Sequence, residues 1–322
     1  MNAIGVDIGG TKIAAGVVSP EGEILNETRY PTQAIPPNRL IETIARAIME
    51  VREGFEVDGA CLAVPGFVLT AKNKVIFAPN LHEIENIRLD EEMGRRTGLG
   101  VTVENDANAA AWGEFRFGAG KNVDHQVFVT LGTGIGGGII THGVLLRGAQ
   151  GAGGELGHVT IDPAGPRCGC GNYGCLEALA SGTAVERRAR EVANERPRSA
   201  LGRLAIERQV LGEDVTRLAG DGDEAAISVL EETGVWLGIG LAAFVNIFNP
   251  EVVAIGGGAS RSGEFIMGPA RKEVQLRARS PSRDLVKIRV ATLGPESGVL
   301  GAAALARGED GKYVLDPSRR VA

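Results

Sequence analysis

Three of the chain's four cysteines lie within eight residues of one another. They belong to the stretch HVTIDPAGPRCGCGNYGCLE, which runs from His158 to Glu177 and contains Cys168, Cys170 and Cys175. Three thiolates and one imidazole make a complete tetrahedral ligand set for zinc, and a set with no open position is of the structural type. A redox site, a phosphate-binding glycine loop and part of a substrate pocket are the alternative interpretations.

The predicted cellular environment favours the metal over disulfide bonds. The N-terminal sequence MNAIGVDIGG has no basic region and carries an aspartate at position 7, unlike a secretory signal. The longest nearly uncharged stretches, 127–146 and 235–248, are interrupted by glycines or too short to span a bilayer. We therefore expect a cytoplasmic chain, in which structural disulfides are rare. Cys61, inside an apolar run, is expected to be a plain buried thiol.

Two aspartates follow apolar runs at places where phosphoryl-transfer chemistry needs a carboxylate. Asp106 lies in the stretch ENDAN (104–108) and has two interpretations. It is either a helix N-cap or a base that accepts a hydroxyl proton, with Asn105 holding the same substrate. Asp7, at the end of the first apolar run, either forms an Asx turn or holds Mg²⁺ beside nucleotide phosphates.

Glycine-rich turns follow three of the apolar runs, at residues 9–12, 132–138 and 256–260. Backbone N–H groups in such turns can form concave sites for anions. None of the three matches the Walker pattern, and none opens a helix as the dinucleotide-binding motif does. The turns therefore predict phosphate binding by β-turns.

The elements that must position these residues are strands followed by helices. Strands are predicted at 3–8 and 13–18 around the first glycine turn, and at 127–131 and 139–146 around the second, which is the mark of a duplicated α/β unit. Further strands are predicted at 58–64, 101–104, 252–255 and 286–291. Helices are predicted at 40–51, at 107–117, from a capping box at 183–186, from 223 to just before Pro250, at 269–279 and after 297.

Length and charge restrict the class of protein. A chain of 322 residues is long for a single core, so two domains are expected, with one glycine turn from each facing a common cleft. Hydrophobic residues make up 43% and charged residues 23%, as in an ordinary globular protein. The net charge is −6, and the densest basic cluster, at 186–190, reads as a solvated helix face, so nucleic acid is not an expected partner.

Five motifs together resemble those of a known family. They are DIGGTK (7–12), ENDANAA (104–110), LGTGIGGG (131–138), GELGH (154–158) and CGCGNYGCLE (168–177). In this order they resemble the ROK (repressor, open reading frame, kinase) group of sugar kinases within the actin-like ATPase superfamily, over nearly the whole chain. The resemblance implies a duplicated, ribonuclease H-like α/β fold with two domains around a cleft and a zinc knuckle. The smaller domain would comprise 1–109 and about 297–322, and the larger 110–296, with the zinc-binding segment at 158–175.

The resemblance also implies roles for individual residues. Asp106 would be the general base that accepts the proton of the sugar's primary hydroxyl. The sugar would be bound by Gly66, Asn80, Asn105, Asp106, Glu155, His158 and Glu177. ATP and Mg²⁺ would be bound by Asp7, Gly9, Gly10, Thr11, Lys12, Thr133, Gly134, Gly256 and Gly257. Structural zinc would be bound by His158, Cys168, Cys170 and Cys175.

The expected activity is ATP-dependent phosphorylation of a hexose. The stretches ENDANAAAWGE (104–114), FGAGK (117–121) and 158–177 look most like the bacterial glucokinases of the group, which implies glucose 6-phosphate as product. Fructokinases and N-acetylmannosamine kinases share most of these residues. A sugar-responsive repressor of the family is disfavoured, because such proteins carry a DNA-binding domain first and here a strand begins at about residue 3. An actin-like ATPase would not need the zinc knuckle. The resemblance further implies a homo-oligomer, dimer or tetramer, with no membrane partner.

Overall fold

The structure is a computed structural model that describes residues 1–32, 35–79 and 81–309, and these residues form two compact units. Of the described residues, those within 1–126, 138–153 and 296–309 form unit 1, and 127–137 and 154–295 form unit 2. The domain division expected from the sequence differs, because it gave 110–126 and 138–153 to the second domain. Residues 110–117 belong with unit 1 because α3 (Asp106–Phe117) packs along α11 (Ser297–Ala306). Residues 138–153 contact α3 and the residues just before it, since a Cβ on Gly138 would lie 2.4 Å from the Ala111 Cβ and Arg147 donates a hydrogen bond to Glu104.

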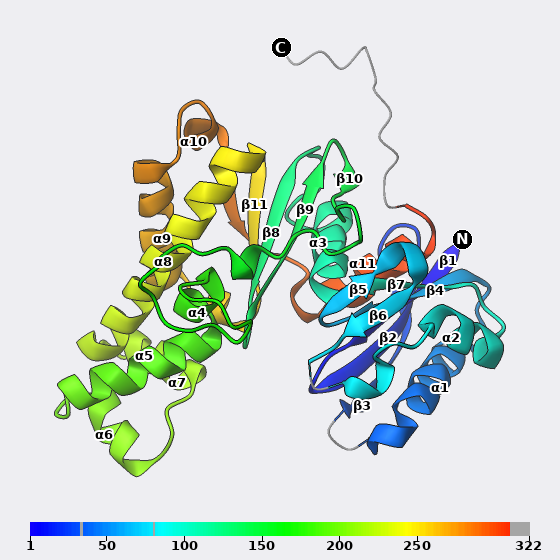
Figure 1. Cartoon of the computed structure of the whole chain (residues 1–322), viewed down its shortest axis with the longest axis horizontal. Coiled ribbons are helices and arrows are strands. Elements are labelled where there is room, and N and C mark those ends of the chain that lie inside the picture. Colours follow the sequence, from blue (N-terminus) through cyan, green and yellow to red (C-terminus); the bar gives the residue numbers. More distant parts are fainter. Residues whose placement is uncertain (33–34, 80, 310–322) are drawn as a thin grey trace. The chain divides into compact units, whose positions relative to one another are not determined.

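Unit 1 is a five-stranded sheet with helices on both faces (Figure 1). The strand order is β3-β2-β1-β4-β7, in which β1 runs antiparallel to β2 and parallel to β4. The strands of this sheet are β1 (Asn2–Ile8), β2 (Lys12–Val18), β3 (Ile24–Pro31), β4 (Val57–Val64) and β7 (Val101–Asn105). The strands β5 (Phe67–Leu69) and β6 (Lys74–Phe77) pair in a separate two-stranded antiparallel sheet. The other helices of unit 1 are α1 (Leu40–Arg52) and α2 (Leu89–Thr97).

Alternation along β1 decides which helix covers which face of this sheet. Ile4, Val6 and Ile8 belong to the apolar core that contains α1 and α2. The residues between them point the other way, since side chains of a strand alternate. Gly5 meets α11 so closely that a Cβ there would lie 1.9 Å from the Val299 carbonyl oxygen. Asp7 therefore lies on the α11 face of the sheet.

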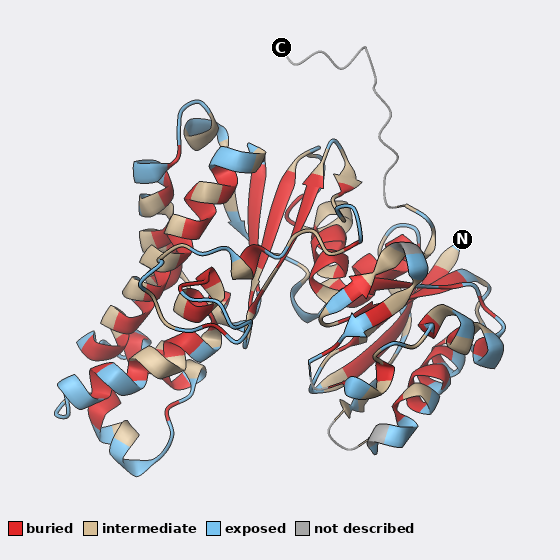
Figure 2. Ribbon diagram, in the orientation of Figure 1, coloured by how far each residue is buried: buried red, intermediate tan, exposed pale blue. Residues whose placement is uncertain are grey.

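Unit 2 is mainly helical, and buried and exposed residues alternate along its helices (Figure 2). Two of its helices, α8 and α9, pack closely through glycines, since a Cβ on Gly234 would lie 2.4 Å from the Ile266 carbonyl oxygen. The helices of unit 2 are α4 (Leu176–Ala180), α5 (Gly182–Glu195), α6 (Ala200–Glu207), α7 (Gly212–Gly220), α8 (Glu224–Phe248), α9 (Glu264–Arg277) and α10 (Ser282–Leu285).

A second five-stranded sheet repeats the strand order of the first. Its order is β10-β9-β8-β11-β12, which matches β3-β2-β1-β4-β7 strand by strand. The strands are β8 (Gln126–Leu131), β9 (Ile135–Thr141), β10 (Val144–Leu145), β11 (Val252–Gly256) and β12 (Lys287–Val290). The common order supports the duplication expected from the two strand, glycine-turn and strand patterns.

Four of the sequence-based boundaries were wrong. The helix predicted at 269–279 is α9, which begins earlier, at Glu264, and contains Pro269 in its interior. The predicted strand 139–146 is two strands, because His142 and Gly143 both adopt positive φ, 51° and 69°, and make a tight turn. The second glycine turn is correspondingly shorter, since β9 begins at Ile135. Helix α5 begins at Gly182 and not at a Thr183 capping box, because the Ser181 side chain accepts the Ala184 N–H.

Helix α8 was predicted correctly, and its ends have clear causes. The Asp223 carboxylate accepts the Ala226 N–H at 2.9 Å, and Asn249 ends the helix in a left-handed conformation before Pro250. The helix is long and apolar enough in composition to cross a membrane, but 56% of that apolar window is buried inside the protein. This burial is typical of a core helix, as the contacts of α8 with α5, α7 and α9 also indicate.

Candidate active site

Asp106 is the first residue of α3, and its neighbour Asn105 is the N-cap. The Asn105 Oδ1 accepts the Asn108 N–H at 3.0 Å, so the cap interpretation belongs to Asn105 and not to Asp106. The Asp106 Oδ1 accepts the Ala107 N–H at 2.8 Å, which orients the carboxylate. The positive end of the helix dipole at this position stabilises the negative charge.

Gly66 lies directly beside Asn105, as the sequence assignment of both to one site requires. The Asn105 Nδ2 donates to the Gly66 carbonyl oxygen at 3.1 Å. Gly66 has a φ of +92°, and a Cβ there would lie 2.2 Å from the Phe77 carbonyl oxygen, so only glycine fits. Asn80, the other sugar-binding residue expected in this part of the chain, lies outside the described residues.

The first glycine turn joins β1 to β2 in unit 1. The Gly9 N–H donates to the Lys12 carbonyl oxygen at 2.8 Å, and Gly10 and Thr11 between them are exposed. Asp7 is half-buried beside the first turn of α11, where a Cβ on Gly298 would lie 2.9 Å from the Asp7 Cγ. Burial raises the pKa of Asp7, and the Lys12 ammonium partly offsets this effect.

The second glycine turn, in unit 2, is fastened to the start of α5. The Gly182 N–H donates to the Gly132 carbonyl oxygen at 2.8 Å. The Thr183 hydroxyl donates to the Thr133 carbonyl oxygen, also at 2.8 Å. Because these carbonyl groups are bound to α5, the backbone of the turn is held in one conformation.

A pocket of about 590 Å³ in unit 2 opens beside this second turn. Such a volume is within the range of small-molecule sites. Its walls come from the end of β8, from α5 and α7, from the segment 258–262 that follows β11, and from one residue each of α8 and α9. They are Leu131, Gly132, Thr133, Gly182, Thr183, Val185, Glu186, Leu211, Gly212, Glu213, Thr216, Arg217, Leu230, Gly258, Ala259, Arg261, Ser262 and Ile266. Gly257 directly precedes the lining segment 258–262. It has a φ of +85°, and a Cβ on it would lie 2.4 Å from the Leu131 carbonyl oxygen.

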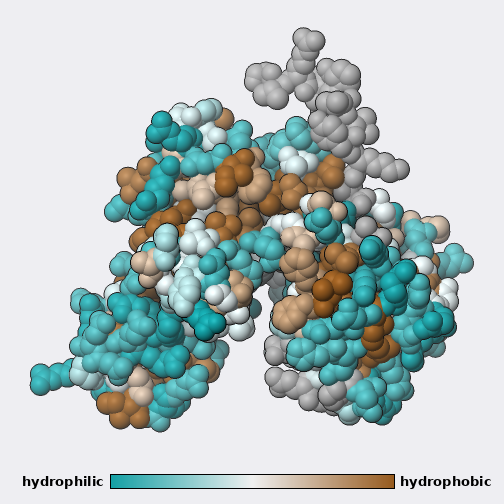
Figure 3. All heavy atoms as spheres, in the orientation of Figure 1, coloured by the Kyte–Doolittle hydropathy of each residue, from teal (hydrophilic) through white to brown (hydrophobic). Residues whose placement is uncertain are grey.

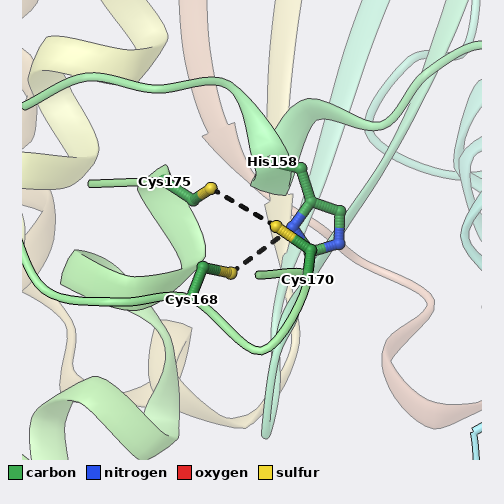
Figure 4. A group of neighbouring side chains, drawn as sticks. All are labelled: His158, Cys168, Cys170 and Cys175. Carbon is green, nitrogen blue, oxygen red and sulfur yellow. Dashed lines mark hydrogen bonds between the residues drawn. The ribbon is translucent and has the colours of Figure 1, made fainter. Parts of the chain in front are cut away.

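His158, Cys168, Cys170 and Cys175 come together in unit 2 (Figure 4). Their ligand atoms all lie within 4.8 Å of one another. The Sγ atoms of Cys170 and Cys175 are 3.7 Å apart, and the Sγ of Cys168 is 3.6 Å from the His158 Nδ1. Zinc with Zn–S bonds of about 2.3 Å would hold two sulfur ligands about 3.8 Å apart in a tetrahedron. The donor set and its spacing therefore fit one structural zinc ion.

Glu155 and Glu177 lie on either side of this cluster. The Glu155 Oε2 is 3.9 Å from the His158 Nε2, the ring nitrogen that does not face the cysteines. The Glu177 Oε1 is 3.6 Å from the Cys168 Sγ, and its Oε2 accepts the Ile135 N–H at 2.9 Å. Glu177 thus connects the cysteine segment to the residue that follows the second glycine turn.

The remaining cysteine has a different environment. Cys61 is buried in β4, and burial raises the pKa of its thiol to about 12. A thiol with so high a pKa is unreactive. The expectation of a plain buried thiol is thereby supported.

A profile of the ROK family matches residues 3–309 of the chain. The chain belongs to the ROK family. The glucokinase of Thermotoga maritima (strain ATCC 43589 / DSM 3109 / JCM 10099 / NBRC 100826 / MSB8) is 40% identical over 307 residues, which cover 95% of this chain and 97% of that protein. The crystal structure of a ROK family glucokinase from Streptomyces griseus in complex with glucose and AMPPNP matches with a TM-score of 0.83 and 40% identity, over 96% of this chain and 100% of that chain. The ROK sugar kinase fold expected from the five motifs is therefore confirmed.

ROK proteins that are named as repressors match at lower identity. The xylose repressor of Bacillus subtilis (strain 168) is 31% identical over 94% of this chain and 76% of the repressor. Family membership alone therefore does not show whether a ROK protein is a kinase or a regulator. The site residues and the more similar relatives are needed to distinguish the two.

Sequence reasoning missed two groups of residues in this ROK chain. The wall of the pocket formed by α7, including Gly212 and Thr216, carries no recognisable motif and comes near the glycine turn only through folding. The other is Arg147, whose Nε donates to the buried Glu104 at 2.6 Å across 43 positions of sequence. A lone arginine in the GAQGAGG region gives no signal of its own, whereas a carboxylate directly before Asn105 and Asp106 could have drawn attention.

Proposed function

We propose that this ROK protein transfers the γ-phosphoryl group of ATP to a hexose, with glucose as substrate and glucose 6-phosphate as product. The observation that carries the proposal is the similarity, over nearly the full length of both chains, to a ROK glucokinase whose structure contains glucose and AMPPNP. The glucokinase name of the Thermotoga maritima relative supports the same activity.

Asp106 would act as the general base in this reaction. Phosphoryl transfer to a hydroxyl needs a carboxylate that accepts the hydroxyl proton as the new O–P bond forms. The Ala107 N–H fixes one oxygen of Asp106, and the first turn of α3 stabilises its charge. The Asn105 amide has two N–H groups, one of which binds Gly66, so the other would be available to a sugar hydroxyl.

The pocket of unit 2 would hold the nucleoside part of ATP, and the turn at Thr133 and Gly134 its phosphates. Free backbone N–H groups at such turns bind phosphate oxygens. Mg²⁺ would spread the charge of the phosphates, with Asp7 and the turn at 9–12 as its expected neighbours. In unit 2, Glu155, His158 and Glu177 would bind sugar hydroxyls, and the structural zinc would orient them as an outer shell orients ligands.

The test is sugar-dependent ADP formation by the Asp106→Ala variant. Loss of a general base lowers turnover by about 10²–10⁴-fold. Binding of AMPPNP should remain at its wild-type affinity, because Asp106 does not line the pocket and is not among the residues proposed to bind the phosphates or Mg²⁺. Near-normal turnover in a correctly folded variant would reject the role of Asp106.

The wild-type protein assayed with glucose, fructose and N-acetylmannosamine decides the sugar. The largest kcat/KM is expected for glucose. A protein that binds a hexose but forms no ADP with any of them would instead be a sugar-responsive regulator, acting in the same cytoplasmic setting.

We also propose that the protein is a homo-oligomer. Apolar atoms gather over the part of unit 2 formed by α8 and β11 (Figure 3). Three large apolar side chains of this unit are exposed, namely Ile247 on α8 (68%), Leu276 on α9 (67%) and Leu285 on α10 (70%). The helix α10 contacts both α8 and α9. Light scattering after size exclusion should give a dimer or tetramer, and a monomer at micromolar concentration would reject the proposal.

A further inference from the structure

Glu104 is a buried carboxylate two positions before Asp106, the proposed general base, and the proposed reaction itself does not require Glu104. Its side chain is only 3% exposed. Its Oε1 accepts two hydrogen bonds, from the Asn105 N–H at 2.9 Å and from the Asn108 Nδ2 at 3.1 Å. Glu104 therefore binds both the N-cap residue of α3 and the residue whose N–H that cap accepts.

Arg147 completes the environment of this carboxylate. Its Nε donates to the Glu104 Oε2 at 2.6 Å. A buried carboxylate without a partner costs several kcal/mol, so the guanidinium compensates a charge that the fold has placed at the end of β7. Arg147 follows β10, and its carbonyl oxygen accepts the Gly153 N–H at 2.8 Å, which closes the loop that leads to Glu155.

A stabilising function alone does not account for an ion pair at this position. Replacement of a buried ion pair by apolar residues of similar volume is often neutral or favourable for stability. An apolar pair would have no oxygen to accept the hydrogen bonds from the Asn105 backbone N–H and the Asn108 side-chain amide, which Glu104 accepts. The bonds of Glu104 thus define the direction in which the first turn of α3 leaves β7.

We infer that Glu104 and Arg147 are positioning residues for Asn105 and Asp106. They hold the N-terminal turn of α3, and through it the carboxylate of Asp106, in the orientation required for proton transfer, and they link this turn to the loop 147–153. The inference deepens the proposed kinase function and rests on it. Neither side chain needs to contact a substrate for this role.

The test compares Glu104→Gln, at the end of β7, with a matched substitution of another buried carboxylate, on α3. Glutamine has the shape of glutamate and keeps one oxygen acceptor. Its NH₂ group, however, would stand where the Glu104 Oε2 accepts the Arg147 N–H, so that two donors would face each other. Glu114→Gln is the control, because Glu114 is likewise a buried carboxylate but lies near the C-terminal end of α3, away from Asp106, where it accepts the Ala119 N–H at 2.8 Å. Arg147→Lys keeps the positive charge and removes the guanidinium.

For Glu104→Gln we expect kcat with glucose to fall about 10–100-fold, the size of effect that a displacement near 1 Å produces. AMPPNP affinity should stay within twofold of wild type. Amide hydrogen exchange in the peptide that covers 104–109 should accelerate. Arg147→Lys should show a smaller loss of kcat, and Glu114→Gln should keep kcat within twofold while its thermal midpoint falls.

Two results would overturn the inference. One is a Glu104→Gln protein with wild-type nucleotide affinity, kcat within twofold and unchanged exchange at 104–109. The other is an equal loss of kcat in Glu104→Gln and Glu114→Gln, which would mean general destabilisation. If the wild-type protein phosphorylates no hexose, the proposed function fails instead, and the exchange measurement still decides whether Glu104 orders the turn.

Discussion

Replacing Gly301 with alanine is expected to destabilise unit 1, although alanine is the better helix former. Gly301 lies within α11, where it faces α3. A Cβ on Gly301 would lie 1.7 Å from the Ala109 carbonyl oxygen and 2.7 Å from the Gly113 nitrogen. Both atoms belong to the α3 backbone, so no change of side-chain rotamer can relieve the overlap.

The magnitude follows from two opposing terms. Alanine in a helix interior gains about 1 kcal/mol over glycine. Overpacking costs about 1–3 kcal/mol, and the upper end applies here because two helix backbones must move apart by more than an ångström. The net loss is about 2 kcal/mol, which lowers the thermal midpoint of a domain of this size by about 4–8 °C.

The matched control is Gly94→Ala in α2. A Cβ there would lie 3.5 Å from the Leu99 carbonyl oxygen, an ordinary contact, so the helix propensity acts alone and the protein should gain up to about 1 kcal/mol. Circular dichroism melts of both variants, with turnover at 25 °C, are the assay. Turnover of Gly301→Ala should also fall, because α3 begins at Asp106. A Gly301→Ala protein as stable as wild type, beside a stabilised Gly94→Ala, would refute the close-packing argument.

Three further predictions concern unit 2. Cys175→Ser should reduce bound zinc, measured by mass spectrometry, from about one ion per chain to almost none. The same variant should bind glucose more weakly in calorimetry. A folded, zinc-free variant with normal glucose affinity would show that the metal only stabilises the fold. Gly257→Ala should weaken AMPPNP binding at least tenfold, because its φ of +85° and the Leu131 carbonyl oxygen exclude a Cβ; unchanged affinity would contradict the pocket assignment. Arg208 lowers the pKa of Asp214 to about 2, so this carboxylate contributes stability above its unfolded pKa of about 4 that is lost as the pH falls toward 2. Denaturation midpoints of Asp214→Asn should therefore depend less on pH between 4 and 2 than those of wild type, and identical slopes would show that the pair contributes nothing.

Much of the fold was predictable because the signals are local. Apolar runs that end in glycine turns predicted β1, β8 and β11, and the strand order of both sheets agrees with the repeat. The errors occurred where a residue type does not by itself indicate the backbone conformation that it adopts. His142 adopts a positive φ that histidine reaches only occasionally, so a hairpin turn was read as continuous strand.

The candidate site was predictable to the extent that its residues lie in motifs. The spacing of the cysteines predicted a cluster, and the structure brings their ligand atoms within 4.8 Å of the histidine nitrogen and of one another. The pocket wall from α7 could not be predicted, because its residues have ordinary types and reach the glycine turn only after α5, α7 and α8 have packed together.

The sequence by itself determined the chemistry that this protein can offer: a carboxylate after a buried strand, glycine turns with exposed N–H groups, and a histidine with three thiols. Tertiary structure decided how each group is used. It made Asn105 the cap and left Asp106 on the first turn, and it paired Glu104 with Arg147. The reason is that strand register and helix packing bring together residues far apart in the chain, and a buried charge must then find its partner among whatever the fold places beside it.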